Sequence, residues 1–480
     1  MNTRALETIG VPPALVRLAK QLVAEARSAG FERSRLRPEL EALLADPGAH
    51  VGHAAFGRLA RALVEAAASD RSPPAPAASA PWRQWGNDID ERAVEQMRNA
   101  MELPVAVAGA LMPDAHVGYG LPIGGVLATE DAVVPYAVGV DIACRMKLSL
   151  LDAPADWIES RRDRLVAALE NETRFGIGAE FGGRADPRRA RFRHHDVLDE
   201  DWDVSPVTRE SRDRARAQLG TSGSGNHFVE FGTLSVDSRQ AAALGLAAAG
   251  THLALLSHSG SRGTGAAVCD HYSRLATRLH PDLPPSMRHL AWLPLDSDAG
   301  QEYWRAMRLM GRYAAANHAV IHRHVAGALG VETILTIENH HNFAWEETHD
   351  VGGRERRLIV HRKGATPAGT GVLGIIPGSM ASPGFVVRGR GVAASLASAS
   401  HGAGRRMSRT DARQRFRWAR MRPLLADRRV EVLSAGIDEV PQAYKDILDV
   451  MAAQSDLVEP LGRFEPRIVK MAPDGERAED

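Results

Sequence analysis

Hydrophobic and polar residues alternate with helical spacing through residues 1–69. In "ALVRLAKQLVAEAR" (14–27) and "FGRLARALVEAAA" (56–68), apolar side chains recur every three or four positions, with Arg, Lys and Glu between them. This period places the apolar side chains on one face of a helix. The following stretch, "DRSPPAPAASAPW", breaks every such pattern. We therefore expect a small helical unit at 1–69, a Pro/Ala/Ser-rich linker at 70–83 and a main body at 84–480.

The main body has a different pattern, in which short apolar runs end at glycine. These runs are "AVVPYAVGVDIA", "LALLSHSG", "ETILTIENHH", "RLIVHRKG" and "GFVVRGRG". They are typical of buried strands. Two longer stretches, 302–329 and 439–458, have amphipathic spacing and predict helices. The pattern as a whole predicts a mixed body of helices and strands with many glycine-bearing loops.

Composition narrows the class of protein. The 480 residues are 44% hydrophobic and 25% charged, with 59 basic against 59 acidic side chains, which is ordinary for a globular enzyme and excludes a coiled coil or a disordered chain. With no net charge, any contact with nucleic acid must come from a local basic groove. Two cysteines, no leader-like N-terminus and no apolar run near the roughly 20 residues that cross a bilayer favour a cytoplasmic protein without membrane segments.

Candidate metal ligands stand at the ends of several apolar runs. They are Asp141 and Cys144 in "VGVDIACRM", His227 in "GSGNHFVE", His258 in "LLSHSGSRGTG", and His340 and His341 in "IENHHNFAWEE". An acid, a thiolate and several imidazoles suit manganese, zinc, iron or cobalt. Each residue alone is more simply a core or rim side chain, so the prediction rests on the recurrence of the pattern in four separate segments.

A second set of residues indicates anion binding. His401 lies among serine and glycine in "SASHGAGRRMSR" and is followed by Arg405, Arg406 and Arg409. Glycine lets backbone amides approach a ligand, and arginine forks suit phosphate. Other glycine-rich segments carry Arg262, Arg362, Lys363, Ser379, Arg388 and Arg390. Tight turns with solvated charges explain each of these segments singly, and none has the spacing of a P-loop or a dinucleotide fingerprint.

Nine motifs occur in an order that resembles the RtcB family of RNA-splicing ligases. They are "MPDAHVGYGLPIGG", "VGVDIACRM", "GNHFVE", "SHSGSRG", "HHNFAWEE", "HRKGAT", "GIIPGSM", "SHGAGR" and "DEVPQAYKDI", spread over roughly residues 84–470. The resemblance implies an α+β fold around one deep cleft with two metal ions. It also implies an enzyme that uses GTP and manganese to join an RNA 3′-phosphate or 2′,3′-cyclic phosphate end to a 5′-hydroxyl end, in RNA repair or tRNA splicing.

The resemblance also implies roles for particular residues of this chain. The metal ligands would be Asp141, Cys144, His227, His258 and His341, and His401 would be the nucleophile that accepts GMP. Nucleotide contacts would fall on Asn226, Phe228, Glu230, Ser379, Ala403, Gly404, Arg405, Tyr444 and Lys470, and Arg262 would contact RNA phosphate. From the residues alone, plain packing on its helix explains Tyr444 nearly as well as stacking on a base.

The chain departs from the family pattern at a few positions. The usual "DIGCGM" reads "DIACRM" here, so Ala143 and Arg145 replace glycines on both sides of Cys144. Arg145 would either weaken metal binding by charge repulsion or supply another phosphate contact. Ser222 stands where leucine is common, and the helical unit at 1–69 lies outside the common core. These differences indicate a divergent member of the family.

Two other functions stay open from the sequence. One is an RNA-end binding protein that has lost turnover, which Arg145 would explain. The other is a metal-dependent phosphoesterase that needs no GTP. Neither function requires a nucleophilic histidine within an intact "SHGAGR" motif, so the RNA ligase is favoured. The sequence leaves open the physiological RNA and the need for an activating protein partner.

Overall fold

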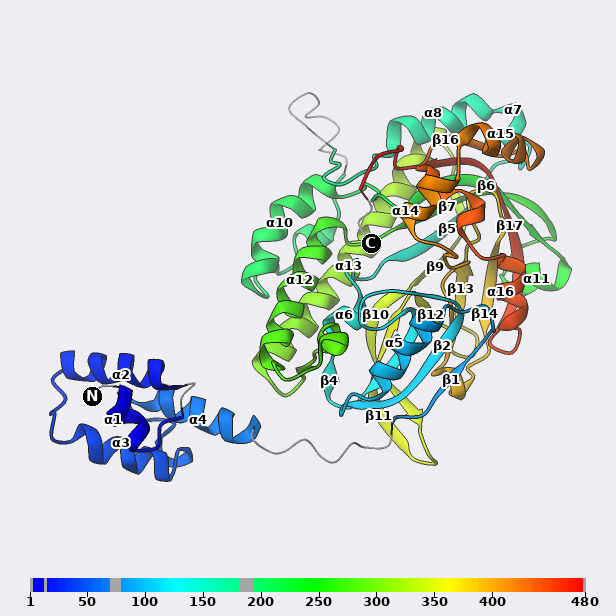
Figure 1. Ribbon diagram of the computed structural model, residues 1–480. Coiled ribbons are helices and arrows are strands. Elements are labelled where there is room, and N and C mark those ends of the chain that lie inside the picture. The colour runs from blue at the N-terminus through cyan, green and yellow to red at the C-terminus, as the bar shows by residue number, and fades with distance from the viewer. Residues whose placement is uncertain (1–2, 13–14, 70–78, 182–192, 478–480) are drawn as a thin grey trace. The chain divides into compact units, whose positions relative to one another are not determined.

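The computed structural model describes residues 3–12, 15–69, 79–181 and 193–477, and it divides the chain into two compact units, Met1–Ala77 and Ala78–Asp480. Figure 1 shows both units. Most of the linker expected at 70–83 (residues 70–78) lies outside the described residues. Its last two residues begin a strand, β1 (Trp82–Gln84). No helix among the described residues has the length and apolarity to span a membrane.

The first unit is a bundle of short helices around its own core. Its helices are α1 (Thr3–Thr8), α2 (Val16–Ser28), α3 (Leu36–Ala45) and α4 (Gly57–Ser69). Leu22, Leu40, Phe56 and Leu59 are buried together at its centre. The 3.6-residue apolar period of the sequence is the reason, because it gives each helix one face to bury.

The second unit is built on two main sheets. The smaller has the order β1, β2 (Ala106–His116), β3 (Ile123–Thr129), β11 (Glu355–Lys363), β10 (Asn342–Asp350). The larger has the order β13 (Leu373–Ile376), β14 (Gly384–Gly389), β17 (Val458–Met471), β6 (Phe228–Val236), β7 (Gly250–Ser259), β5 (Arg145–Leu151), β9 (Thr333–His340), and β16 (Glu431–Ser434) pairs with β17. The second unit also has two separate two-stranded sheets: β4 (Ala132–Val133) with β8 (Leu293–Pro294), and β12 (Ala365–Pro367) with β15 (Ser398–Ser400).

Helices cover these sheets. They are α5 (Glu91–Met101), α6 (Pro135–Val138), α7 (Trp157–Ser160), α8 (Arg162–Glu172), α10 (Pro206–Gln218), α11 (Ser238–Ala243), α12 (Arg262–Leu279), α13 (Asp298–Leu329), α14 (Arg409–Arg415), α15 (Trp418–Asp427) and α16 (Ile447–Ala453). The expected α+β class is confirmed, and so is the long helix expected at 302–329, which is α13.

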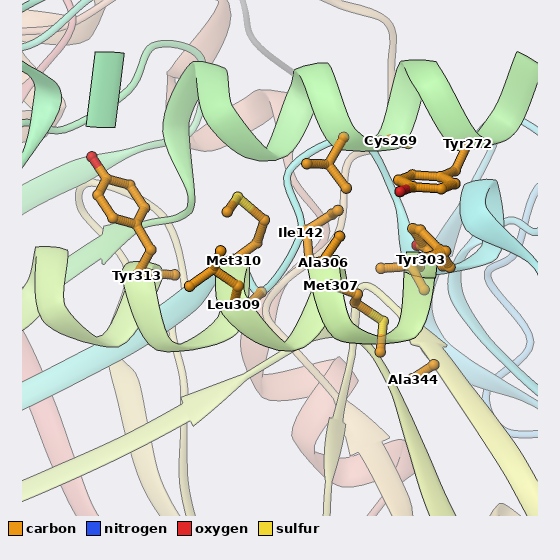
Figure 2. Packing of buried hydrophobic residues seen from close by; sticks show 14 of the residues in the cluster. Ile142, Cys269, Tyr272, Tyr303, Ala306, Met307, Leu309, Met310, Tyr313 and Ala344 are labelled. Atoms are coloured by element: carbon orange, nitrogen blue, oxygen red, sulfur yellow. The ribbon is translucent and has the colours of Figure 1, made fainter. Parts of the chain in front are cut away.

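The largest core cluster lies where α12 and α13 pack together. Figure 2 shows Cys269 and Tyr272 of α12 beside Ala306 and Met310 of α13. The rings of Tyr272 and Tyr303 have centroids 5.1 Å apart. Cys269 is therefore a small buried apolar residue of the core, as cysteines outside functional sites usually are.

The prediction of a helix at 439–458 is wrong over most of that range. The structure has two short 3₁₀ turns, Ile437–Glu439 and Pro441–Ala443, then α16, and β17 begins at Val458. Pro441 has no backbone N–H to donate, and Tyr444 forms a bridge with Arg405 instead of continuing a helix. Asp446 then caps α16 by accepting from the amide of Leu448. Tyr444 therefore belongs to an extended segment.

Candidate active site and metal centre

Strand pairing brings five of the six candidate metal ligands together at one end of the strands of the larger sheet. Cys144 precedes β5, His227 precedes β6, His258 lies near the end of β7 and His341 follows β9. Cys144 Sγ lies 3.3 Å from His227 Nε2 and 3.1 Å from His258 Nε2. His258 Nε2 lies 3.2 Å from His341 Nε2, and His227 Nε2 lies 3.2 Å from Asp141 Oδ2. All five residues are buried.

The protonation of this cluster fits a metal ion. Burial lowers the pKa of His258 to about 3 and the pKa of His341 well below its ordinary value, so both rings are neutral, as ligands must be. His258 Nδ1 lies 3.1 Å from the carbonyl oxygen of Asn226, which accepts a hydrogen bond from Nδ1–H, so the lone pair of the neutral ring is on Nε2. Among the described residues, Nδ1 of His227 and Nδ1 of His341 have no hydrogen-bond partner. A thiol, a carboxylate and imidazoles with orphaned nitrogens suit a borderline divalent cation.

A cavity of about 960 Å³ joins this cluster to His401. His401 follows β15, and its ring centroid lies 4.8 Å from that of His341. Its Nδ1 lies 2.7 Å from Oδ2 of Asp114 on β2, and the amides of His401 and Gly402 donate to the same oxygen at 3.1 and 3.3 Å. Burial opposes the ionisation of Asp114, but the contact with His401 lowers its pKa overall. The ionised carboxylate can only accept, so Nδ1 donates to it, and in the neutral ring the lone pair is on Nε2.

Most of the residues assigned to nucleotide binding line the same cavity. They are Asn226, Phe228, Glu230, Ser379, Ala403, Gly404, Arg405 and Tyr444. Phe228 contacts the ring of His258, with centroids 5.7 Å apart. Glu230 is buried, and burial raises its pKa well above the ordinary value.

Arg405 and Tyr444 form a polar cluster at the cavity wall. The guanidinium of Arg405 lies 5.2 Å from the ring centroid of Tyr444, and its Nη2 donates to the carbonyl oxygen of Asp438 at 2.9 Å. Glu439 accepts hydrogen bonds from Tyr444 and Arg409. Glu439 is buried, so it holds two cations and a phenol in place at the wall.

Arg262 and Lys470 do not line this cavity. Arg262 is buried and donates to Thr221 Oγ1 at 3.1 Å and to the carbonyl oxygen of Gly176 at 2.9 Å. On β17, Val469 and Met471 face the cavity, and Lys470 Nζ donates to Glu170 Oε2 at 2.9 Å and to the carbonyl oxygen of Leu169 at 3.1 Å. The alternation of side chains along a strand accounts for the orientation of Lys470.

Arg145 also lies outside the cavity lining. Cys144 and Met146 line the cavity, whereas Arg145 between them is buried, with Nη2 lying 3.2 Å from His340 Nδ1. The side chain therefore does not reach the cavity as a phosphate contact. The neighbouring Ala143 has a φ of 58°, in the left-handed region that favours glycine. This backbone explains why the family pattern has glycine there, and its amide donates to the carbonyl oxygen of Asn342 at 2.6 Å.

Sequence reasoning did not assign several residues that shape this site. Asp114 orients His401, and Lys445 Nζ donates to the carbonyl oxygens of Pro113 and Ala115 at 2.9 and 3.0 Å, which fixes the backbone around Asp114. Lys363, which the sequence placed among the candidates for anion binding, does line the cavity, and burial lowers its pKa to about 8. The only sequence signal for Asp114 was its place in the motif "MPDAH", because its partner His401 is 287 residues away.

Several known proteins are similar to this chain. Residues 96–471 match the family described as tRNA-splicing ligase RtcB. The chain is 33% identical to the RNA-splicing ligase RtcB of Escherichia coli K12 over 405 residues, which cover 79% of this chain and 95% of that protein. It is 34% identical to the RNA-splicing ligase RtcB of Mycobacterium tuberculosis (77% and 98% covered) and 32% identical to the tRNA-splicing ligase RtcB of Nanoarchaeum equitans (77% and 88% covered). The chain belongs to the RtcB family.

Proposed function

We propose that this protein is a GTP- and manganese-dependent RNA ligase that joins an RNA 3′-phosphate or 2′,3′-cyclic phosphate end to a 5′-hydroxyl end through a guanylylated His401. The observation that carries the proposal is the contact of His401 with buried Asp114, next to a buried Cys/His cluster that suits a metal ion. The names of the related proteins, which are RNA-splicing ligases, support the same reaction class.

His401 would act as the nucleophile. Its Nε2 lone pair attacks the α-phosphorus of GTP, an N–P bond forms, and the bond to the bridging oxygen breaks so that pyrophosphate leaves. Asp114 accepts from Nδ1–H and stabilises the positive charge that develops on the ring. When bound by Asp141, Cys144, His227, His258 and His341, two manganese ions would supply Lewis-acid stabilisation of the phosphate charge.

GMP would then pass to the RNA. An oxygen of the RNA 3′-phosphate attacks the phosphorus on His401, and the N–P bond breaks. The 5′-hydroxyl next attacks the activated RNA phosphate, which forms the new phosphodiester and releases GMP. A cyclic phosphate must first be opened by water to a 3′-phosphate. Arg405 and Arg409 at the cavity wall would hold phosphate charge during these transfers.

The cavity lining supports guanine as the base in this proposal. Glu230 is buried in the cavity, and as a carboxylate it would accept from guanine N1–H and N2–H, two donors that would offset the burial that raises its pKa. Tyr444 offers a ring for contact with the base. Asn226, Phe228, Ser379, Ala403 and Gly404 are the remaining residues that we propose to contact the nucleotide. Arg262 and Lys470 are left out of this set because they do not line the cavity.

The test is covalent labelling. The full chain is incubated with manganese and GTP labelled at the α-phosphate, beside His401→Ala and the control His271→Ala, whose histidine is exposed on α12. We expect acid-labile label on the native chain and on the control, and none on His401→Ala. Absence of label from the native chain with manganese bound contradicts the proposal. RNA-end binding alone would then indicate a binding protein, and hydrolysis of cyclic phosphate without GTP a phosphoesterase.

A further inference from the structure

An exposed aromatic ring stands at the cavity on the loop between β2 and β3. Tyr119 is 65% exposed and Val117, on the same loop, is 39% exposed, and both line the cavity. Apolar side chains that are exposed together, especially beside polar residues, mark ligand-binding surfaces more often than single exposed ones do. Neither residue is among the site residues expected from the sequence.

The loop is held rigidly in spite of its exposure. Gln96 brackets Gly118, donating to its carbonyl oxygen at 2.6 Å and accepting from its amide at 3.0 Å. Lys363 Nζ donates to the carbonyl oxygen of Tyr119 at 2.5 Å. Gly120 has a φ of 70°, and a Cβ there would lie 2.9 Å from the carbonyl oxygen of His289. A ring fixed in this way loses little conformational freedom when a ligand binds.

Other aromatic rings support Tyr119 from one side. The rings of Tyr119 and His289 meet edge to face with centroids 5.7 Å apart, and His289 meets Tyr136 in the same manner at 4.6 Å. Lys363 Nζ lies 5.8 Å from the centroid of Tyr136. The part of the Tyr119 ring that is exposed is not covered by His289, and Tyr119 lines a cavity that Lys363 also lines.

The loop is also close to the histidine that we propose as nucleophile. Lys363 holds the carbonyl oxygen of Tyr119, and the next residue, Gly364, lies so near His401 that a Cβ on it would be 3.2 Å from His401 Cε1. Tyr119 and His401 line the same cavity, so an RNA strand whose end reaches His401 can place a nucleotide near that end against this ring.

We propose that Tyr119 is a stacking platform for a base of the RNA strand whose end enters the cavity. Every base has a π-face, so such a platform accepts any sequence and supplies affinity without selecting a base. The proposal rests on the proposed ligase function for the identity of the ligand as RNA. It assigns Tyr119 to RNA rather than to the guanine of GTP, because Tyr444 and Glu230 already account for the guanine.

The experiment compares the native chain with Tyr119→Ala, Tyr119→Phe and the control Leu279→Ala, which removes an exposed side chain at the end of α12. The dissociation constant of fluorescent single-stranded RNA with a 3′-phosphate or a 5′-hydroxyl end is measured by anisotropy with manganese present. Tyr119→Ala should weaken binding of one of these RNAs roughly 5- to 150-fold, the equivalent of ~1–3 kcal/mol per stacked base. Tyr119→Phe and Leu279→Ala should bind as the native chain does.

An abasic nucleotide identifies the contact. Removing the stacked base from the RNA should weaken binding to the native chain by a similar factor and should have little further effect on Tyr119→Ala, since both changes delete the same interaction. Guanylylation of Tyr119→Ala without RNA should proceed as in the native chain. Equal RNA affinities of Tyr119→Ala and the native chain would overturn the proposal, and so would a raised KM for GTP.

Different measurements would contradict the proposed function and the stacking role of Tyr119. Lack of covalent label on the native chain contradicts the ligase. The binding assay requires no turnover, so it still decides whether Tyr119 contacts RNA. Unchanged RNA binding together with normal labelling would contradict the stacking alone.

Discussion

His401 owes its orientation to one buried carboxylate. Three hydrogen-bond donors, from the ring and backbone of His401 and the backbone of Gly402, converge on Oδ2 of Asp114. Asp114 has no exposed surface and is held by strand β2, so its position relative to the ring is fixed. The tautomer of His401 therefore depends on a residue from a distant part of the chain.

We predict that Asp114→Asn slows guanylylation by roughly 10²- to 10⁴-fold. An amide in place of the carboxylate can donate to Nδ1, which would put the proton on Nε2 and remove the attacking lone pair. The measurement is the single-turnover rate of label incorporation from GTP, with the urea midpoint checked to confirm that the variant folds. An unchanged rate in a folded variant would mean that Asp114 does not set the tautomer.

Arg362 shows that an arginine in a glycine-rich segment can serve the structure instead of a ligand. Its guanidinium is buried and makes two parallel contacts with Glu347, at 2.7 and 2.9 Å. It also donates to Ser398 Oγ at 2.8 Å. Burial raises the pKa of Glu347, but the contacts with His349 and Arg362 outweigh burial and hold the pKa at about 2.

We predict that Glu347→Gln lowers the free energy of unfolding by ~2–3 kcal/mol at neutral pH, because Arg362 loses its buried counter-charge. Since the folded pKa of Glu347 is about 2 against an ordinary 4.5, the contribution is complete above pH 4.5 and disappears as the pH falls towards 2. Urea unfolding at several pH values measures this difference. Glu346→Gln is the control, because Glu346 pairs with exposed Arg357 and should change little. A difference independent of pH would refute the assignment.

At the scale of elements, α13 joins the helical core to the candidate metal centre. Its apolar residues pack against α12 (Figure 2). Its polar residues Asn317, His318 and His322 are buried against the strands that carry the candidate ligands. His318 and His322 both contact Ser257 Oγ on β7, at 2.7 and 2.8 Å, next to His258. These contacts of α13 therefore hold the part of β7 that carries His258.

Among the polar residues of α13, we expect Asn317 to affect stability and the candidate metal site most. It accepts from the amide of Gly220 at 2.6 Å and donates to Thr221 and Ser259 at 2.9 and 3.2 Å. We predict that Asn317→Ala lowers the free energy of unfolding by ~2–4 kcal/mol, because buried partners lose their hydrogen bonds. Manganese affinity should fall about 10-fold, since Ser259 neighbours His258.

Urea unfolding of the metal-free chain and calorimetric titration with manganese measure the two effects separately. Arg308→Ala, on the exposed face of the same helix, is the control and should alter neither. Loss of stability with unchanged manganese affinity would show that α13 supports the core but not the ligands.

At the scale of the whole molecule, the two units have separate cores. Among the residues that the structure describes, the cluster around Leu40 and Phe56 draws its buried members from Leu6 to Leu63, and the other clusters draw theirs from Ala80 onwards. A unit with its own core can unfold independently of its neighbour. The role of the first unit as a module that positions RNA or a protein partner, as opposed to a stabilising extension, is thus a question that deletion can address.

We predict that a protein beginning at Ala78 keeps the melting temperature of the second unit and its rate of guanylylation. The cut must precede Ala80, whose amide donates to the carbonyl oxygen of Met101 at 3.0 Å, and β1, which pairs with β2. Calorimetry and label incorporation provide the comparison. A lower ligation rate with intact guanylylation would assign the first unit to RNA binding, whereas a lower melting temperature would show that it stabilises its neighbour.

The sequence by itself determined those features that depend on neighbouring residues. The helical period predicted α13, and the polar residues at the ends of apolar runs predicted a cluster in which Cys144, His227 and His258 do meet. The ordered motifs indicated the family to which the chain belongs. Local spacing is sufficient here because one residue's place on a helix face or strand end is set by the few residues around it.

Only the tertiary structure decided which distant side chains meet and which way they point. Asp114 and His401 are 287 residues apart, so no local pattern relates them. Arg145 lies in a motif of the site and Lys470 lies on a strand that borders the cavity, yet strand alternation turns both side chains away from the cavity. The helix expected at 439–458 gave way to Tyr444 pairing with Arg405. In each case a contact between residues far apart in the sequence decides where the side chain lies. Which residues form that contact is known only once the register of the strands is known.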